Sequence, residues 1–356
     1  MSIRGRSVFT EEPIEVEIEH GRIASVASVD DDKASLPYLS PGFFDSQVNG
    51  YFGSDYSLEE LSEEHVEGIT RRLAESGTTQ HIPTFVSMPQ ERLLCNLKTT
   101  VHALRASEVM RNSVPGLHVE GPFISPEDGP RGAHDPEFVR PPDFREFEQW
   151  QEAAEGMISY VTLAPELDGA LRFIEKVVAT GTRVAIGHTA ASREDIRRAV
   201  EAGATLSTHL GNGSHTQLPR LRNYVWEQLA ADELYAGCIC DGFHLPESVV
   251  KVMARAKGID KLILVSDVAL LGGYEPGRYK WGNLDVQVFD DGHLGLPDTS
   301  ILAGAAHLLD WDLARFVEFT GHDLGTAVKL CTKNPAEFLG DFDAHYGELS
   351  VEAPAN

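Results

Sequence analysis

The sequence predicts an α/β protein whose main domain is a (β/α)₈ TIM barrel. From Pro41 onward, short apolar runs alternate with helical patterns of roughly 10 to 18 residues, which is typical of repeated βα units around a parallel sheet. The chain has 356 residues, more than the roughly 250 that one barrel usually needs. We therefore expect one barrel with a small accessory module.

Eight apolar runs are candidate barrel strands. They cover residues 41–47, 79–85, 115–120, 158–166, 183–188, 204–209, 235–241 and 261–267. Strands of a parallel sheet are buried on both faces and are usually apolar throughout, yet most of these runs end in a polar residue. The carboxyl ends of barrel strands form the mouth where catalysis occurs. The polar ends predicted at this mouth are Gln47, Glu120, Glu166, His188, His209, Asp241 and Asp267.

The accessory module is predicted to be a small β-sandwich. Its N-terminal part is residues 1–40, in which alternating polar and apolar residues surround a His-Gly turn. We expect residues 274–300, which alternate around an Asp-Asp-Gly turn, and residues 346–356 to join it. The barrel is assigned to residues 41–345.

Further elements surround the predicted barrel. Helical patterns are expected at about 304–318 and 322–333, after the last barrel strand. Residues 125–142 are rich in Pro, Gly and charge, and are interpreted as a long loop over the mouth.

Charge and cysteine content restrict the class of partner. The net charge is −25, which repels phosphate backbones and anionic lipid, so neither nucleic acid nor a membrane is an expected partner. The four cysteines show neither disulfide density nor paired C-x-x-C spacing, and the chain begins without a signal-peptide pattern. A soluble protein of the reducing cytoplasm is expected.

Three strand ends favour a metal site. His188 and His209 lie one βα period apart, so adjacent strands would place both imidazoles at the mouth. Glu120 can add an oxygen ligand and complete a His₂Glu set that leaves a position for water. A single His of this kind is more often a hydrogen-bonded strand end. The three together favour one divalent cation, Zn²⁺ first, with Fe²⁺ and Co²⁺ as alternatives.

Asp267 is the candidate catalytic residue. It follows the apolar run LILVS, where a buried carboxylate costs desolvation unless it is used. Beside a cation that activates water, this carboxylate can take the proton and pass it to a leaving nitrogen. An N-cap for the next helix is the structural alternative.

Several motifs resemble one known family. They are PGFFDSQVNG, LHVEGPFISPEDGPRGAHDP, VTLAPE, IGHT, STHLGNGS, CDGFHLP, LVSDVA and LAGA, in this order from residue 41 to 305. This combination resembles the N-acetylglucosamine-6-phosphate deacetylase family of the amidohydrolase superfamily. The resemblance implies a barrel of the amidohydrolase type that hydrolyses the acetamide of N-acetyl-D-glucosamine 6-phosphate to the amine and acetate.

The resemblance also implies roles for individual residues. Glu120, His188 and His209 match the metal ligands, and Asp267 matches the catalytic acid and base. Gln47-Val48-Asn49 stands where many amidohydrolases carry an H-x-H motif, which favours a single metal ion. The match to Arg220 implies a phosphate contact reaching from the neighbouring subunit of a homodimer. Substrate contacts are therefore predicted for Gln47, His134, Asn212, Gly213, Arg220 and His244.

The sequence departs from the family pattern at three places. The run after His209 is LGNGSHTQLPRLRN, where the family usually has an aromatic residue and NAM, and VALLGG follows Asp267 in place of an Ala-rich stretch. The ending YGELSVEAPAN resembles only the start of the closing segment of the family. These departures leave open a deacetylase for another N-acetylated amino sugar, phosphorylated or not. A non-catalytic sugar-phosphate binding protein is the alternative from a different class.

Overall fold

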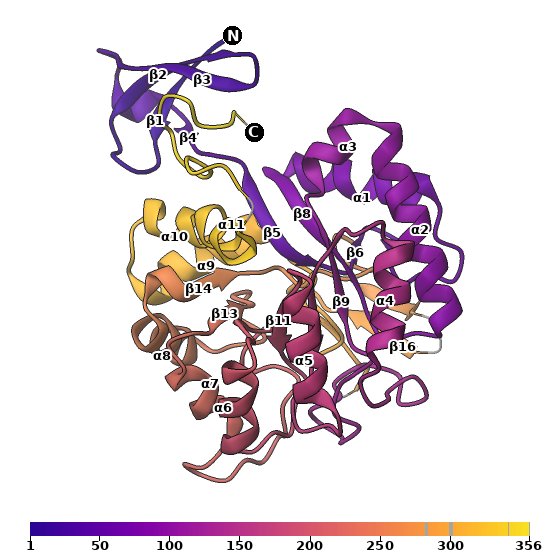
Figure 1. Ribbon diagram of the computed structural model, residues 1–356. Helices are drawn as coiled ribbons and strands as arrows, with labels where there is room; N and C mark the ends of the chain where they lie inside the picture. Colours follow the sequence, from indigo (N-terminus) through magenta and orange to yellow (C-terminus); the bar gives the residue numbers. More distant parts are fainter. Residues whose placement is uncertain (282–283, 299–301, 341, 356) are drawn as a thin grey trace.

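An eight-stranded parallel barrel forms the centre of the molecule (Figure 1). This computed structural model describes residues 1–281, 284–298, 302–340 and 342–355. The strands neighbour one another in the order β14-β13-β12-β11-β10-β9-β8-β5. Their bounds are β5 Phe43–Val48, β8 Thr78–Phe85, β9 Leu117–Glu120, β10 Ile158–Leu163, β11 Arg183–Ile186, β12 Leu206–Ser207, β13 Tyr235–Cys238 and β14 Leu262–Leu264.

The barrel closes between its first and last strands. Val48 pairs in parallel with Val268, and the Asp267 amide donates to the Gln47 carbonyl at 3.0 Å. All eight predicted strands are present, so the predicted barrel is confirmed. Except for β8, the observed strands are shorter than the apolar runs, because several runs leave the sheet before their polar final residue, which is free to face the mouth.

The lower half of the barrel is filled by side chains from the strands. Phe44, Ile82 and Tyr160 belong to one buried cluster, and Phe338 of α11 packs edge-on against Tyr160 with ring centroids 5.6 Å apart. A filled barrel has no pore through it, so chemistry is confined to the carboxyl ends of the strands.

Helices surround the barrel, as the helical patterns predict. They are α1 Glu63–Glu75, α2 Gln90–Ala106, α3 Glu108–Ser113, α4 Phe144–Ala153, α5 Ala170–Ala179, α6 Arg193–Glu201, α7 Tyr224–Ala230, α8 Glu247–Lys257, α9 Leu309–Thr320, α10 Leu324–Leu330 and α11 Lys333–Leu339, with short turns η1 Lys33–Ser35 and η2 Ile259–Lys261. The helix expected from about 304 begins at Leu309, because Ala305 instead pairs with Val268 beside the last strand. No helix among the described residues is both long and apolar enough to cross a membrane.

A four-stranded sheet stands apart from the barrel, and both chain ends lie beside it (Figure 1). It contains β1 Ser2–Ser7, β2 Pro13–Glu19, β3 Arg22–Ser28 and β4 Tyr38–Leu39. The C-terminal segment joins this sheet, since the Ile23 amide donates to the Ala353 carbonyl at 2.9 Å. Ala353 is fully buried against Ile14, Val16 and Ile23.

The segment 274–300 does not pair with this N-terminal sheet, which corrects our expectation for it. Its described residues form β15 Gly277–Trp281, β16 Leu284–Val288 and β17 Leu294–Gly295, a separate antiparallel sheet; residues 282–283 and 299–300 lie outside the described part. Val286 and Val288 pack with Leu271 beyond the last barrel strand. The alternation correctly indicated strands, but the apolar face is buried against a nearer surface. A two-stranded hairpin, β6 Gly50–Tyr51 and β7 Ser54–Asp55, follows β5.

Candidate active site at the barrel mouth

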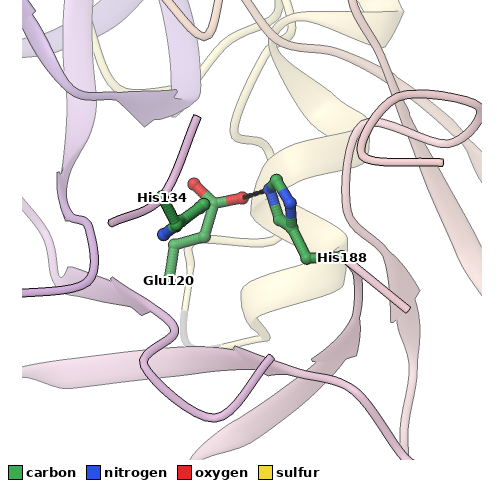
Figure 2. A group of neighbouring side chains, drawn as sticks. All are labelled: Glu120, His134 and His188. Carbon is green, nitrogen blue, oxygen red and sulfur yellow. Dashed lines mark hydrogen bonds and ion pairs between the residues drawn. The ribbon is translucent and has the colours of Figure 1, made fainter. Parts of the chain in front are cut away.

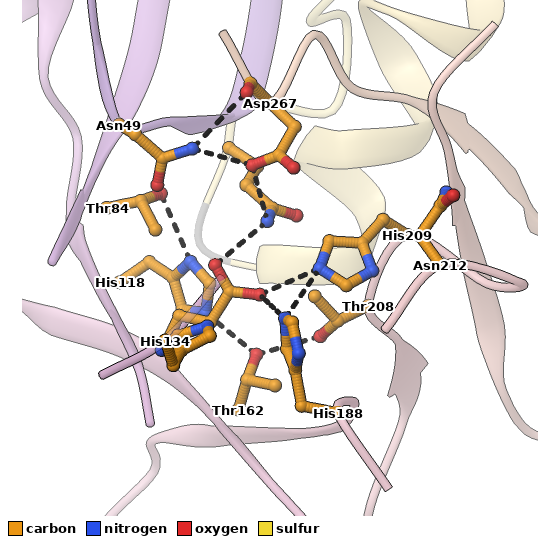
Figure 3. Close-up of polar contacts among 12 residues, drawn as sticks. Asn49, Thr84, His118, His134, Thr162, His188, Thr208, His209, Asn212 and Asp267 are labelled. Carbon is orange, nitrogen blue, oxygen red and sulfur yellow. Dashed lines mark hydrogen bonds and ion pairs between the residues drawn. The ribbon is translucent and has the colours of Figure 1, made fainter. Parts of the chain in front are cut away.

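Three predicted ligand atoms converge at the mouth (Figure 3). Glu120 ends β9, and His188 and His209 follow β11 and β12 by two residues. Glu120 Oε1 lies 3.2 Å from His188 Nε2 and 2.9 Å from His209 Nε2, and the two Nε2 atoms are 3.1 Å apart. All three residues are buried. The structure therefore brings the three predicted ligand atoms together in one triangle, with sides of 2.9 to 3.2 Å.

The loop 125–142 fixes the orientation of the His188 ring. His188 Nδ1 donates to the Pro130 carbonyl at 2.8 Å, which leaves the lone pair of Nε2 for a metal. Gly132 and Gly213 pack closely against this ring from two loops. A Cβ atom added to Gly132 would lie 3.0 Å from His188 Cε1, and a Cβ atom added to Gly213 would lie 2.6 Å from His188 Nδ1. His188 is therefore held by its surroundings before any cation binds.

Three site residues have a backbone conformation that L-amino acids rarely adopt. The φ angles are +50° at His188, +26° at His209 and +51° at Asp267. Such strain persists where the surrounding structure enforces it, and it is frequent at functional sites. Here the strained residues lie just beyond three barrel strands, where the chain turns after each strand and directs a side chain into the mouth.

The three donor atoms fit a divalent cation. Ligands about 2.0 to 2.2 Å from a tetrahedral Zn²⁺ lie roughly 3.3 Å from each other, close to the separations seen here. Burial alone would raise the pKa of Glu120, but the adjacent imidazoles of His188 and His209 hold this pKa well below its usual range. Glu120 is thus an ionised carboxylate facing two imidazole nitrogens, a donor set suited to Zn²⁺, Fe²⁺ or Co²⁺.

His134 offers a second grouping that contains Glu120 and His188 (Figure 2), with ligand atoms within 4.8 Å of one another. The hydrogen bonds of His134 favour His209 as the third ligand. The Ser87 amide donates to His134 Nδ1 at 3.3 Å, and burial lowers the pKa of His134 to about 3. A neutral ring that accepts at Nδ1 carries its proton on Nε2, so it can donate to a substrate but has no lone pair there for a metal.

Asp267 lies beside the triangle and is held by two amides. Gln47 Nε2 donates to Asp267 Oδ1 at 3.0 Å and to Glu120 Oε2 at 3.2 Å. Asn49 Nδ2 donates to the same Oδ1 at 2.7 Å (Figure 3). Burial raises the pKa of Asp267 from its usual value. The assignment of Gln47 to substrate binding stays a prediction, because its described contacts are with the two carboxylates.

Two further predicted residues present polar groups near the site. His244 Nδ1 lies 2.7 Å from Asp241 Oδ2, which orients the ring and leaves Nε2 for a substrate. The Asn212 side-chain nitrogen is buried without a hydrogen-bond partner among the described residues. An unpaired buried donor costs free energy, so it supports a ligand contact at this position.

Gly213 and Arg220 differ in their surroundings. Gly213 packs against the His188 ring, so its described contact is with a metal-ligand candidate. Arg220 is exposed and forms no hydrogen bond or ion pair within the described chain. Contacts of both residues with substrate stay predictions.

Sequence reasoning missed three supporting residues. Asn49 was noted only as a replacement for His, and Gly132 was read as part of a loop. Glu166 was placed at the mouth without a role; it accepts hydrogen bonds from Thr189 Oγ1 at 2.5 Å and the Ala190 amide at 2.6 Å, immediately after His188. The amide pair at positions 47 and 49 was the signal that could have identified Asn49.

A buried polar layer lies beneath the ligands (Figure 3). The His118 ring bonds Thr84 Oγ1 at 3.1 Å and Thr162 Oγ1 at 2.8 Å, and Thr162 bonds Thr208 Oγ1 at 2.7 Å. Burial lowers the pKa of His118 to about 3, so its ring is neutral. This layer ties together the strands that carry Glu120 and His209.

A known family model matches most of the chain. The family model described as "Amidohydrolase family" matches residues 38–356. The chain therefore belongs to the amidohydrolase family.

Within that family, several similar proteins are N-acetylglucosamine-6-phosphate deacetylases. The Bacillus subtilis (strain 168) enzyme is 30% identical over 355 residues, which cover 96% of this chain and 87% of the relative. The Mus musculus enzyme is 32% identical over 332 residues, 89% of this chain and 78% of the relative. The crystal structure of the Mycobacterium smegmatis enzyme has a TM-score of 0.87 at 27% identity and covers 100% of this chain and 94% of that one.

A second Mycobacterium smegmatis structure contains N-acetyl-D-glucosamine-6-phosphate bound to a variant enzyme. It has a TM-score of 0.86 at 27% identity and covers 99% of this chain and 93% of that one.

Proposed function

We propose that this chain hydrolyses the acetamide of N-acetyl-D-glucosamine 6-phosphate to glucosamine 6-phosphate and acetate. The observation that carries the proposal is the convergence of Glu120, His188 and His209 beside the buried Asp267, in a chain similar to deacetylases along most of its length. The similar proteins suggest which substrate is hydrolysed. The arrangement of metal-ligand candidates and Asp267 supports hydrolysis of an amide.

Glu120, His188 and His209 would hold one divalent cation. When bound, such a cation polarises the amide carbonyl and makes water a stronger nucleophile. Asp267 is then the group that takes a proton from the attacking water and returns it to the departing amine nitrogen. His134 would donate from Nε2 to the substrate; the hydrogen bond that its Nδ1 accepts from the Ser87 amide supports this role.

The same proposal assigns the sugar-binding side of the site. Asn212 and His244 would hydrogen-bond the sugar, with Gln47 and Gly213 lining the site close to the cation. Arg220, exposed on the loop after β12, would bind the 6-phosphate of a substrate held by the neighbouring subunit. A homodimer follows from this arrangement.

Zn²⁺ is the proposed cation, since two imidazoles and one carboxylate match its usual catalytic ligands; Fe²⁺ and Co²⁺ are the alternatives. The four cysteines Cys95, Cys238, Cys240 and Cys331 are all free, which supports a cytoplasmic location.

Acetate release tests the proposal directly. The protein reconstituted with Zn²⁺ is assayed with N-acetylglucosamine 6-phosphate and with N-acetylglucosamine, and a chelated sample is the control. We expect chelator-sensitive release that strongly favours the phosphorylated sugar. Equal or reversed preference would contradict the phosphate role of Arg220 and favour another N-acetylated amino sugar, the candidate that the altered segment after His209 suggests. Tight sugar binding without acetate release would favour a non-catalytic binding protein.

A further inference from the structure

The Asn49 amide contacts Asp267 at both its side chain and its backbone. Asn49 Nδ2 lies 2.7 Å from Asp267 Oδ1 and 3.3 Å from the Asp267 carbonyl oxygen. Both acceptors are oxygens, so the nitrogen side of the amide must face them, which fixes the orientation of the amide. Asn49 is 7% exposed, and no water layer separates the two residues.

The backbone holds Asn49 and Asp267 in fixed register. The Asn49 amide donates to the Val268 carbonyl at 2.9 Å, and the Asp267 amide donates to the Gln47 carbonyl at 3.0 Å. The Asn49 carbonyl accepts from the Tyr56 amide at 2.8 Å. The first two bonds belong to the seam that closes the barrel, so Asn49 is a rigid support for a residue whose own backbone is strained at φ +51°.

The two oxygens of the Asp267 carboxylate have different surroundings. Oδ1 accepts from both Asn49 and Gln47, which uses both of its lone pairs. Oδ2 takes part in no hydrogen bond within the described chain. A proton on Oδ1 would have to displace an amide donor, whereas Oδ2 can gain and lose a proton with both amides in place.

We propose that Asn49 is a positioning residue that fixes the Asp267 carboxylate so that Oδ2 alone carries the proton. This inference rests on the proposed function, because it assigns the atom that moves the proton during amide hydrolysis. Oδ2 takes the proton of the attacking water as its oxygen bonds to the carbonyl carbon. The same proton passes to the amine nitrogen as the carbon–nitrogen bond breaks. Gln47 also holds the Asp267 carboxylate, but it contacts the metal-ligand candidate Glu120 as well. A substitution at Asn49 therefore tests the positioning of Asp267 without removing a contact to a metal ligand.

The test uses Asn49→Ala in the full chain, with Asn96→Ala as the matched control. Asn96 is also a buried Asn, and its amide donates to the carbonyls of Tyr56 and Leu58 at 2.9 Å, away from the metal ligands. Both variants lose two donated hydrogen bonds, so both should lower thermal stability. Only Asn49→Ala should lower kcat, by about 10- to 100-fold, with KM and bound metal per chain unchanged.

A second variant and a second readout keep the test decisive. Asn49→Asp keeps the side-chain volume but replaces the donor with an oxygen, so it should lower kcat at least as much. In the crystal structure of metal-free Asn49→Ala, the Asp267 carboxylate should leave its present orientation. Asn49 variants with wild-type kcat, or an unmoved Asp267 carboxylate, would overturn the proposal. If the wild-type chain releases no acetate, the proposed function fails, while the orientation of Asp267 in metal-free protein still tests the role of Asn49.

Discussion

The Nε2 atoms of His188 and His209 face each other at 3.1 Å, and Glu120 Oε1 lies within 3.2 Å of both. Two imidazole nitrogens and one ionised carboxylate cannot all be satisfied by hydrogen bonds among themselves. A divalent cation would satisfy all three lone pairs.

Loss of a ligand should therefore lower the bound metal. Glu120→Ala and His209→Ala are each expected to lose most metal per chain after dialysis, measured by plasma emission spectroscopy, because two remaining ligands bind weakly. His102→Ala is the control, since this exposed histidine pairs with the exposed Glu63. Full metal content in Glu120→Ala would mean that the site lies elsewhere.

Asp267→Asn should separate metal binding from turnover. The variant keeps the shape of the side chain but cannot take up a proton, so kcat should fall at least about 100-fold while bound metal stays constant. Steady-state acetate release and metal analysis on the same preparation give both values. Activity close to that of the wild-type protein would rule out Asp267 as the proton carrier.

Gly213→Ala tests whether packing orients His188. The new Cβ would lie 2.6 Å from His188 Nδ1, at a residue whose φ is +53°. We expect lower metal affinity and activity, because the ring must move. Gly156→Ala is the matched control: φ is +84° there, but no atom lies within 4 Å of the added Cβ. Equal losses in both variants would assign the effect to backbone strain alone.

Arg220→Ala should raise KM for the phosphorylated sugar by about 10-fold or more, because a charge-assisted contact is lost, and leave turnover of the unphosphorylated sugar unchanged. Arg222→Ala, at the neighbouring exposed arginine, is the control. If Arg220 acts in the neighbouring subunit, mixing Arg220→Ala with Asp267→Asn subunits should restore part of the activity, since a mixed dimer would have one site with both residues. Without such recovery, Arg220 does not act across subunits.

Asp45 should make stability depend on pH. Burial raises the pKa of Asp45 to about 7, whereas an unfolded Asp titrates near 4. Between these values the native state holds the proton and the unfolded state does not, so the free energy of unfolding falls as pH rises. Asp45→Asn should remove up to about 4 kcal/mol of this dependence, measured by urea unfolding of metal-free protein from pH 4 to 8. Exposed Asp30→Asn should keep the slope, and an unchanged slope in Asp45→Asn would contradict the assignment.

Local patterns were sufficient to predict the barrel and to select polar strand ends at its mouth. A buried parallel strand is apolar along its length, so a terminal Glu, His or Asp is conspicuous, as at Glu120 and Asp267. The βα period then predicts that such ends meet at one mouth. The segment 274–300 was misplaced, because alternation reports that one face is buried but does not identify the surface that buries it.

The sequence by itself determined the eight strands, the mouth and the residue types able to hold a metal and move a proton. Only the tertiary structure showed that the atoms of Glu120, His188 and His209 face one another, and that the Nδ1 atom of His134 accepts from the Ser87 amide, because these contacts join groups far apart along the chain. It also placed Asn49 against Asp267, 218 residues away along the chain. Strand patterns arise from local burial, whereas these contacts arise only when the barrel closes and brings its first and last strands together.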